Sequence, residues 1–265
     1  MNNNAKSDEA LSAYRLDGKV AIVTGGGSGL GRTTSLLFAE VGATVAILDL
    51  DPKAAEATAD QIRKAGGRAM ARKCDVSHEP DVIAAFDEVE KAHGTLDVLV
   101  NCAAYRGKAE FFDITQKQWD DMFAVTTRGT FYCMRAAVKQ MQAGKRGGSI
   151  VNISSVCSQK TSIFANIHYD AAKAGVDALT RGVAVEFHGD AIRANSVLPA
   201  GMKTEGLSNI QTSINFRGPA TQPGRLMFGY ADPIEIARAV LFLASPAASY
   251  ITGHSLAVDG GFLVS

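Results

Sequence analysis

The sequence lacks an excess of charge of either sign, because its 27 lysines and arginines equal its 27 aspartates and glutamates. A balanced charge gives no field that attracts nucleic acid or an anionic membrane surface, so we expect neither as a partner. No apolar run approaches the ~18 residues that a membrane-spanning helix needs. The remaining composition, 46% hydrophobic and 20% charged residues, is that of an ordinary globular protein.

Cysteine is scarce, and its four positions, Cys74, Cys102, Cys133 and Cys157, show no Cys-x-x-Cys spacing. Widely spaced cysteines among apolar residues are typical of reduced thiols, so we expect a cytoplasmic protein. The five histidines form no His-Glu-x-x-His or similar spacing, and we expect no metal site. Residues 1–14 are polar and contain no apolar run, so they do not resemble a secretory signal and we expect a flexible tail there.

Short apolar runs alternate with helical segments from residue 15 to residue 265. The expected strands lie at about 19–24, 43–49, 68–74, 96–101, 148–154, 192–198 and 255–258. The expected helices lie at about 32–40, 52–65, 80–92, 118–142, around Tyr169, and at 234–243. This alternation predicts a single α/β domain with a doubly wound, Rossmann-like parallel sheet of about seven strands and helices on both faces. Ligands of such folds bind at the carboxyl ends of the strands.

A glycine-rich turn, Thr-Gly-Gly-Gly-Ser-Gly-Leu-Gly, follows the first expected strand at residues 24–31. Strand, turn and helix together present backbone N–H groups and a helix N-terminus to a phosphate. Gly25, Gly29 and Gly31 allow the tight turn, the close approach of a pyrophosphate and close helix–strand packing. Asp49 ends the next strand, where a carboxylate accepts from the ribose of NAD and repels the extra phosphate of NADP. We therefore expect NAD as the cofactor.

The same turn differs from a Walker A loop at one residue of the motif, so a nucleoside triphosphatase is a rival hypothesis. Arg32 stands where that loop places its phosphate-binding lysine. The pattern of strand, glycine turn and a second strand ending in an acid also suits a dinucleotide better. We favour the dinucleotide hypothesis.

Tyr169 and Lys173 stand at i and i+4 in an alanine-rich segment, so a helix places both side chains on one face. A nearby ammonium favours the phenolate and lowers a tyrosine pKa from about 10. The Tyr169 hydroxyl then transfers protons nearer neutrality, and the Ser155 hydroxyl can orient the same substrate oxygen. Tyr-x-x-x-Lys is weak alone, but Gly25, Asp49 and Ser155 fall at neighbouring strand ends and strengthen it.

These motifs together resemble the short-chain dehydrogenase/reductase family, in its shorter, single-domain subtype. The resemblance covers about residues 16–262. It rests on Thr24-Gly-x3-Gly29-x-Gly31, Asp75-Val76, Asn101-x-Ala103, Ser155, Tyr169-x3-Lys173, Pro199 through Thr204, and the ending from Ile251 to Gly261. The implied function is NAD-dependent interconversion of a secondary alcohol and a ketone.

The resemblance also implies a role for each matching residue. Tyr169 is the expected general acid/base, Lys173 holds the nicotinamide ribose and lowers the Tyr169 pKa, and Ser155 binds the substrate oxygen. The implied cofactor residues are Gly25, Ser28, Gly29 and Leu30 at the pyrophosphate, Asp49 at the adenosine ribose, Asp75 and Val76 at the adenine, Asn101 and Ala103 along the cleft, and Pro199, Met202 and Thr204 around the carboxamide.

Four features depart from the family's pattern. Ala104 replaces a glycine after Asn101, and Ala200 separates Pro199 from its glycine. The step from Ser155 to Tyr169 is 14 positions, one more than usual. Thr126 stands where the family has an asparagine that is thought to hold the water of a proton relay. The substitution puts that relay in question.

Residues 204–228 contain several glycines and prolines and little periodicity, where the family carries a mobile substrate lid. Apolar residues there and at Ile163 indicate a largely apolar, cyclic or aromatic alcohol or ketone. Arg106, Lys108 and Lys160 are candidate anchors for an anionic substrate, although a solvated charge is the simpler interpretation of each. Two alternative functions are an NADP-dependent carbonyl reductase and a nucleotide-binding regulator without catalysis. By the resemblance we expect a homo-oligomer, a tetramer or a dimer.

Overall fold

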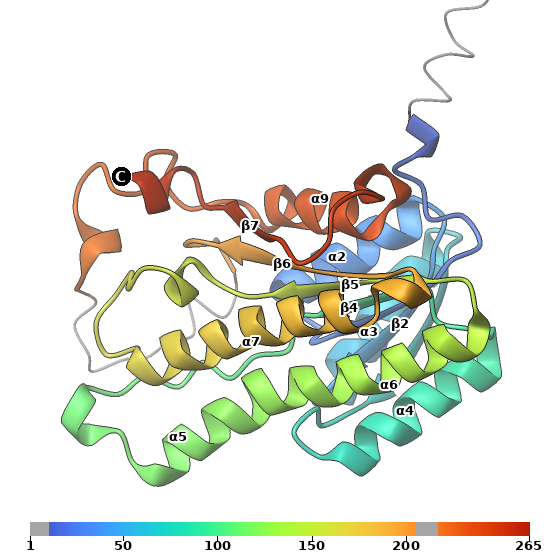
Figure 1. Cartoon of the computed structure of the whole chain (residues 1–265), viewed down its shortest axis with the longest axis horizontal. Coiled ribbons are helices and arrows are strands. Elements are labelled where there is room, and N and C mark those ends of the chain that lie inside the picture. The colour runs from blue at the N-terminus through green and yellow to red at the C-terminus, as the bar shows by residue number, and fades with distance from the viewer. Residues whose placement is uncertain (1–10, 205–216) are drawn as a thin grey trace, which may run out of the picture.

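Seven parallel strands form one sheet in the order β3-β2-β1-β4-β5-β6-β7 (Figure 1). The computed structural model describes residues 11–204 and 217–265. The strands are β1 Val20–Thr24, β2 Thr44–Asp49, β3 Arg68–Lys73, β4 Val98–Asn101, β5 Gly148–Ile153, β6 Ile192–Pro199 and β7 Ser255–Val258. The predicted doubly wound parallel sheet is confirmed, and each predicted strand lies within two residues of its observed bounds.

Helices cover both faces of the sheet. The helices are α2 Gly29–Glu40, α3 Pro52–Lys64, α4 Glu79–His93, α5 Gln116–Phe123, α6 Gly129–Gly144, α7 Ile167–Glu186 and α9 Pro233–Ala244. One apolar cluster joins α2, α3 and α9 to one face, and a second joins α4, α6 and α7 to the other. Figure 1 shows these two helical layers on opposite sides of the strands.

The strand β1 shows why the sheet is buried on both sides. Ala21 and Val23 belong to one apolar cluster and Ile22 to the other, and all three are fully buried. Burying an aliphatic side chain of this size contributes about 1.5–3 kcal/mol, so a continuous apolar run stabilises a strand between two helical layers. The strand β3 lies at the edge and is correspondingly more exposed.

The long helix expected over residues 118–142 is interrupted. The helix α5 begins with a capping box between Thr115 and Gln118, which satisfies N–H groups at both positions. A π-helical turn, Ala124–Arg128, then joins α5 to α6. Such a turn widens the backbone ladder locally and often accompanies a functional site, and here it contains Thr126.

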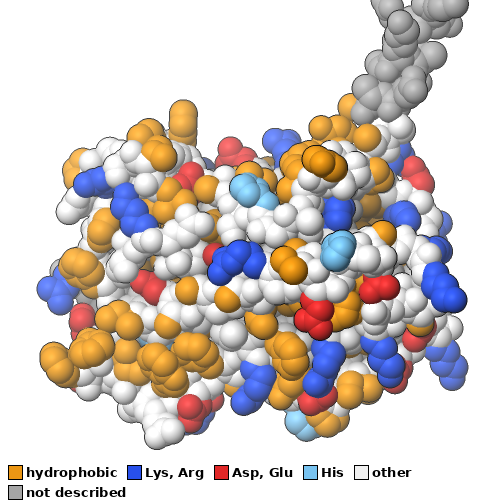
Figure 2. Space-filling view, in the orientation of Figure 1, with side chains coloured by type: hydrophobic (Ala, Val, Ile, Leu, Met, Phe, Trp, Pro, Cys, Tyr) orange, Lys and Arg blue, Asp and Glu red, His pale blue; other side chains and the backbone are white. Residues whose placement is uncertain are grey.

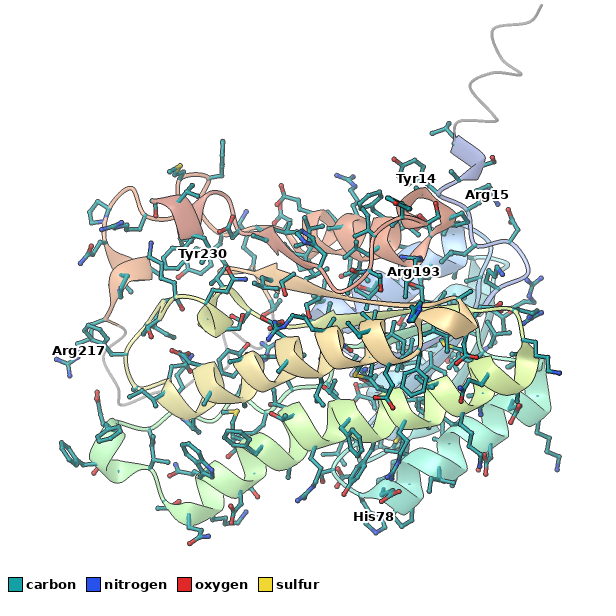
Figure 3. All side chains as sticks on the ribbon, viewed as in Figure 1. Tyr14, Arg15, His78, Arg193, Arg217 and Tyr230 are labelled. Atoms are coloured by element: carbon teal, nitrogen blue, oxygen red, sulfur yellow. The ribbon has the colours of Figure 1, made fainter. Side chains whose placement is uncertain are left out.

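The end of the predicted N-terminal tail contacts the domain. The Ala247 N–H donates to the Ala13 carbonyl at 2.9 Å, and the Tyr14 ring lies 6.3 Å from that of Phe242 in α9 (Figure 3). The chain therefore contacts the domain two residues before the expected boundary at residue 15.

Much of the predicted lid, residues 205–216, lies outside the described residues. No helix in the described segments combines the length and apolar character needed to cross a lipid bilayer.

Candidate active site

The glycine turn brings backbone segments unusually close together at the carboxyl end of β1. A Cβ at Gly31 would lie 2.0 Å from the Gly25 carbonyl oxygen, and a Cβ at Gly25 would lie 2.9 Å from the Ala103 backbone. Ser28 precedes α2 without a side-chain capping bond, and the first turn of α2 carries no acid. The N-terminus of α2 therefore has N–H groups without a side-chain cap, which fits a phosphate.

Asp49 lies beside this turn, as the sequence predicts for a ribose-binding acid. One carboxylate oxygen accepts from the Gly27 N–H at 2.9 Å, and the other accepts from the Asp51 N–H at 3.0 Å. These bonds orient the carboxylate between the glycine turn and the start of α3. A carboxylate oriented there can accept further bonds from hydroxyl groups.

The residues expected at the adenine are engaged with the protein itself. The Asp75 carboxylate accepts from the Ser77 N–H at 2.9 Å and from the Ser77 hydroxyl at 2.7 Å. The Val76 side chain packs closely against Gly129. A Cβ at Gly129 would lie 2.9 Å from a methyl carbon of Val76. The role of Asp75 and Val76 toward adenine stays a prediction.

Thr24 ties the end of β1 to the segment after β4. Its hydroxyl accepts from the Cys102 and Ala103 N–H groups at 3.1 Å and 3.2 Å. Asn101 is buried, and its amide donates to the Asn152 side chain at 2.8 Å, which joins β4 to β5. Asn101 and Ala103 are not among the residues that line the cavity described next, so Asn101 supports the sheet beneath that cavity.

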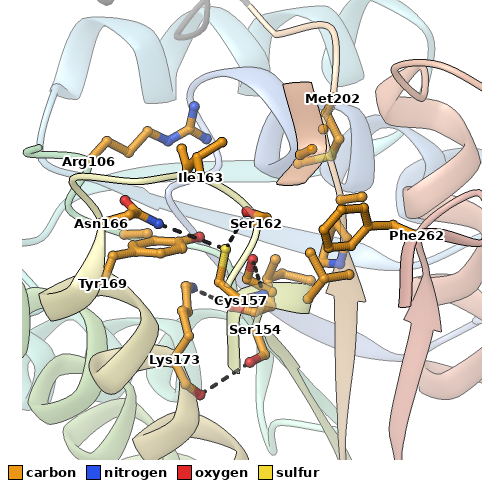
Figure 4. Close-up of a pocket in the computed structure, with 18 of the residues that line it drawn as sticks. Arg106, Ser154, Cys157, Ser162, Ile163, Asn166, Tyr169, Lys173, Met202 and Phe262 are labelled. Carbon is orange, nitrogen blue, oxygen red and sulfur yellow. Dashed lines mark hydrogen bonds between the residues drawn. The ribbon is translucent and has the colours of Figure 1, made fainter. Parts of the chain in front are cut away.

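A cavity of about 600 Å³ opens at the carboxyl ends of β4, β5 and β6 (Figure 4). It brings together many of the predicted residues: Leu30, Ser155, Tyr169, Lys173, Pro199, Met202 and Thr204. Of the predicted residues, Gly25, Ser28, Gly29, Gly31, Asp49, Asp75, Val76, Asn101 and Ala103 are not part of its wall. Most of these surround the glycine turn or the adjoining strand ends.

The loop after β5 positions the predicted catalytic serine. The Ser155 hydroxyl accepts from the Cys157 N–H at 3.2 Å and caps the short helix Val156–Ser158. The Ser155 hydroxyl also lowers the pKa of Tyr169, and both residues line the cavity. Ser154, the other candidate in this register, is buried with its hydroxyl donating to the Lys173 carbonyl at 3.2 Å. Both serines line the cavity, and the choice of Ser155 as the oxygen-binding serine stays a prediction.

Lys173 is buried beside the tyrosine but bonds to the sheet. Its ammonium donates to the Ile153 carbonyl at 2.6 Å and lies 5.6 Å from the centre of the Tyr169 ring. Burial lowers the pKa of Lys173 to about 8, because desolvation disfavours the charged form.

The pKa of Tyr169 does not follow the sequence prediction. Burial raises it well above its usual value, although the Ser155 hydroxyl and the charge of Arg106 act in the opposite direction. The expectation that Lys173 lowers this pKa is therefore wrong for the structure described here. The physical reason is that burying the phenol outweighs the groups that favour the phenolate.

A polar cluster in the cavity wall was missed by sequence reasoning. The Cys157 thiol and the Ser162 hydroxyl lie 2.9 Å apart, and the Asn166 amide donates to the Asp170 carboxylate at 3.0 Å. These contacts tie the loop of residues 159–166, which carries the additional residue, to the start of α7. The non-glycine residue Ala165, with φ +58°, makes the loop turn sharply before the helix. The unusual spacing was the one available signal.

Thr126 lies outside the cavity wall. It is fully buried, its hydroxyl donates to the Met122 sulfur at 3.7 Å, and its carbonyl accepts from the Thr130 hydroxyl at 2.7 Å. The threonine hydroxyl is thus directed within its own helix rather than into the cavity.

Within residues 11–204 and 217–265, no cluster of three or more His, Cys, Asp or Glu side chains could hold a metal ion. The site therefore offers hydroxyl, phenol and ammonium groups, backbone N–H donors and one oriented carboxylate for chemistry and binding.

The chain matches the family model described as enoyl-(acyl carrier protein) reductase over residues 25–263. It is 38% identical over 246 residues to cis-4-hydroxycyclohexanecarboxylate dehydrogenase of Sinomonas cyclohexanicum, covering 92% of this chain and 96% of that protein. It is 37% identical over 253 residues to 2,5-dichloro-2,5-cyclohexadiene-1,4-diol dehydrogenase of Sphingobium indicum, covering 95% and 99%.

A solved structure is also similar to this chain over nearly its whole length. A 7α-hydroxysteroid dehydrogenase, complexed with NADH and 7-oxo glycochenodeoxycholic acid, superposes with a TM-score of 0.85 at 30% identity, covering 98% of each chain. Matches of this extent, together with the observed sheet and the Ser155, Tyr169 and Lys173 cavity, mean that the chain is an oxidoreductase of the short-chain dehydrogenase/reductase family.

Proposed function

We propose that the protein is an NAD-dependent oxidoreductase that interconverts a secondary alcohol and a ketone, with Tyr169 as general acid/base. The observation that carries this proposal is that Ser155, Tyr169 and the buried Lys173 line one cavity. A hydroxyl and a phenol that converge on one point can bind a single substrate oxygen, where charge develops during the reaction.

The chain's own groups divide the work as follows. Tyr169 donates a proton to a ketone oxygen in reduction and accepts the hydroxyl proton in oxidation. Its raised pKa keeps it protonated at neutral pH, as reduction requires. Oxidation requires the phenolate, which the positive charge of Arg106 favours. Ser155 holds the substrate oxygen at the tyrosine, and the bound nicotinamide supplies or accepts the hydride.

The described residues fit a dinucleotide. The uncapped N-terminus of α2 and the close approach at Gly25 and Gly31 suit the pyrophosphate. Leu30, Pro199, Met202 and Thr204 line the cavity where the nicotinamide end would lie. Asp49 supports NAD over NADP, because its carboxylate would repel a ribose phosphate.

The cavity wall supports a largely apolar, cyclic substrate. Ile163, Met202, Leu226 and Phe262 all line it, and apolar walls of this kind bind ring carbons. Phe164 is half exposed and is not among the lining residues. The names of the two dehydrogenases compared above, both with ring substrates, support the same substrate class.

The test is a panel of secondary alcohols and ketones with NAD(H) and with NADP(H), followed at the nicotinamide absorbance. Turnover of cyclic alcohols with NAD supports the proposal, whereas a preference for NADPH and ketones supports the carbonyl reductase. Tight NAD binding without turnover of any compound indicates the nucleotide-binding regulator.

We also propose that the protein works in the cytoplasm as a homo-oligomer, a dimer or a tetramer. The four cysteines are all free, which suits a reducing compartment. Phe111, Phe112 and Trp119 are exposed, and Figure 2 shows apolar side chains gathered over this region of η1 (Phe111–Asp113) and α5. Exposed apolar patches mark interaction surfaces, and light scattering on the purified protein measures the oligomeric state.

A further inference from the structure

The cavity carries positive charge although the whole chain is neutral. Its wall includes the cationic side chains of Arg106, Lys108 and Lys173, and among the described residues no aspartate or glutamate belongs to it. Lys173 is committed to the Ile153 carbonyl and to the tyrosine. Lys108 has no part in the proposed proton transfer and Arg106 acts on it only through its charge, so the position of both side chains needs a further explanation.

The positive charge of Lys108 is partly offset by a carboxylate that is not part of the cavity wall. It is half-buried, and burial lowers its pKa while the charge of Asp170 raises it. Asp170 is held at this place by bonds from Thr161 and Asn166, both at 3.0 Å. The positive charge of Lys108 therefore acts in the cavity only in part.

Arg106 has no such balance within the described part of the chain. Its recorded partner in residues 11–204 and 217–265 is the Thr204 hydroxyl at 3.5 Å, and no described carboxylate forms an ion pair with it. Arg106 is exposed, and a guanidinium has five N–H donors arranged in a planar fork, so its other donors are open to solvent or to a bound ligand. Figure 4 shows the side chain extending along the cavity on the side of Ile163.

The charge of Arg106 also reaches the reacting end of the cavity. It lowers the pKa of Tyr169 and the pKa of Lys173, which places the guanidinium within electrostatic range of both. A group bound to Arg106 and a group bound to Tyr169 can therefore belong to one small molecule. Met202 and Phe262 line the cavity with apolar side chains. The part of such a molecule that joins its two polar groups is therefore expected to be an apolar ring.

We infer that the substrate is a cyclic hydroxy acid, whose carboxylate pairs with Arg106 while its alcohol or ketone oxygen binds Ser155 and Tyr169. The inference rests on the proposed alcohol–ketone chemistry and adds the anionic group. Arginine matches a carboxylate by two parallel N–H bonds, so a charged acid gains affinity over its neutral amide.

The experiment compares 4-hydroxycyclohexanecarboxylate with 4-hydroxycyclohexanecarboxamide, using the ratio of their kcat/KM values. We expect the wild-type enzyme to favour the acid by about tenfold, the scale of a lost charged hydrogen bond. Arg106→Gln should abolish the ratio and Arg106→Lys should retain part of it. Arg72→Gln is the matched control, because Arg72 pairs with Glu88 on the surface, outside the cavity wall.

Binding of the unreactive cyclohexanecarboxylate and its amide, measured by calorimetry, gives a readout that does not need turnover. Tighter binding of the acid that disappears in Arg106→Gln supports the inference even if no alcohol is oxidised, the result that contradicts the proposed function. Equal binding of acid and amide by the wild type overturns the inference while cyclic alcohols are still oxidised. An Arg106→Gln variant that weakens NAD and both ligands alike also overturns it, because the guanidinium then serves the cofactor phosphates.

Discussion

The Lys173 ammonium and the Tyr169 ring lie one helical turn apart on α7, with 5.6 Å between the nitrogen and the ring centre. The ammonium donates to the Ile153 carbonyl rather than to the phenol oxygen. Tyr169 instead lies in the cavity wall with Ser155, whose hydroxyl lowers its pKa. The phenol and the buried cation therefore share one cavity, and the cation is held by the end of β5 rather than by the phenol oxygen.

The first prediction concerns the proton donor. Tyr169→Phe keeps the buried ring and removes the hydroxyl, so kcat/KM should fall by about 10²–10⁴, the usual contribution of a general acid or base. The NAD dissociation constant should change by less than about twofold, because the ring still fills the same space. Steady-state kinetics and NAD titration check both statements. A variant that keeps more than a tenth of the activity would show that Tyr169 is not the acid/base.

The second prediction concerns cofactor choice. Asp49→Ala removes the carboxylate that faces the glycine turn, so the ratio of kcat/KM for NAD over NADP should fall by about tenfold or more, since a charged hydrogen bond is worth roughly 1.5–3 kcal/mol. Asp49→Asn keeps an acceptor for the Gly27 N–H and removes only the charge. An unchanged ratio in both variants would take Asp49 out of the ribose site.

The third prediction uses the same substitution at two helical glycines. A Cβ at Gly182 in α7 meets nothing within 4 Å, whereas a Cβ at Gly31 in α2 meets the Gly25 carbonyl oxygen. Gly182→Ala should raise the free energy of unfolding by up to about 1 kcal/mol, the difference in helix propensity. Gly31→Ala should lower it by about 1–3 kcal/mol and weaken NAD binding, because the turn must open. Urea unfolding and NAD titration test the pair, and equal effects of the two substitutions would contradict the geometry.

The fourth prediction concerns the pH dependence of stability. The pKa of Lys173 is about 8 in the folded protein, below the value of about 10.4 in an unfolded chain. Below pH 8 the lysine is charged in both states, and the folded state carries the full desolvation penalty. Between these two pKa values the unfolded chain binds more protons, so wild-type stability gains with rising pH.

Lys173→Met removes this titration. The variant should therefore be more stable than wild type at pH 7, by up to about 3 kcal/mol if the whole pKa difference acts. That advantage should shrink as the pH rises from 8 to about 10.5. Unfolding by urea at several pH values measures it. An advantage that does not change with pH would contradict the lowered pKa of Lys173.

Much of the fold and of the cofactor end could be predicted because the signals are local. The apolar run of β1, the glycines after it and Asp49 at the end of β2 each follow from spacing along a few residues. The placement of Tyr169, Lys173 and Ser155 in one cavity follows because parallel strands end at the same edge of the sheet.

Other features depend on three-dimensional surroundings that the sequence does not encode locally. The pKa of Tyr169 depends on how deeply the loop before α7 buries it. The inward direction of Asn101 depends on its partner Asn152 on the neighbouring strand. The position of Arg106 at the cavity depends on Thr204, which is 98 residues away along the chain. Each of these is a long-range contact, which pattern reasoning does not reach.

The last prediction concerns Thr126, where the family usually has asparagine. Two explanations of the proton relay are open: a water held by a backbone carbonyl and Lys173, or the threonine hydroxyl itself as a hydrogen-bond partner. The contacts favour the first, because the Thr126 hydroxyl donates to the Met122 sulfur and is not among the groups that line the cavity. The Thr126 carbonyl accepts from Thr130, and a carbonyl has a second lone pair for a water.

Thr126→Val keeps the branched shape in the π-helical turn and removes only the hydroxyl. Because the lost partner is a weakly accepting sulfur, kcat should stay within about threefold of wild type, a change of under about 1 kcal/mol in the barrier. A loss of tenfold or more, with circular dichroism and NAD affinity unchanged, would assign the relay to the hydroxyl, since that is the scale of a missing acid–base partner. A fully active variant leaves the backbone carbonyl of the π-helical turn as the group that replaces the family's asparagine.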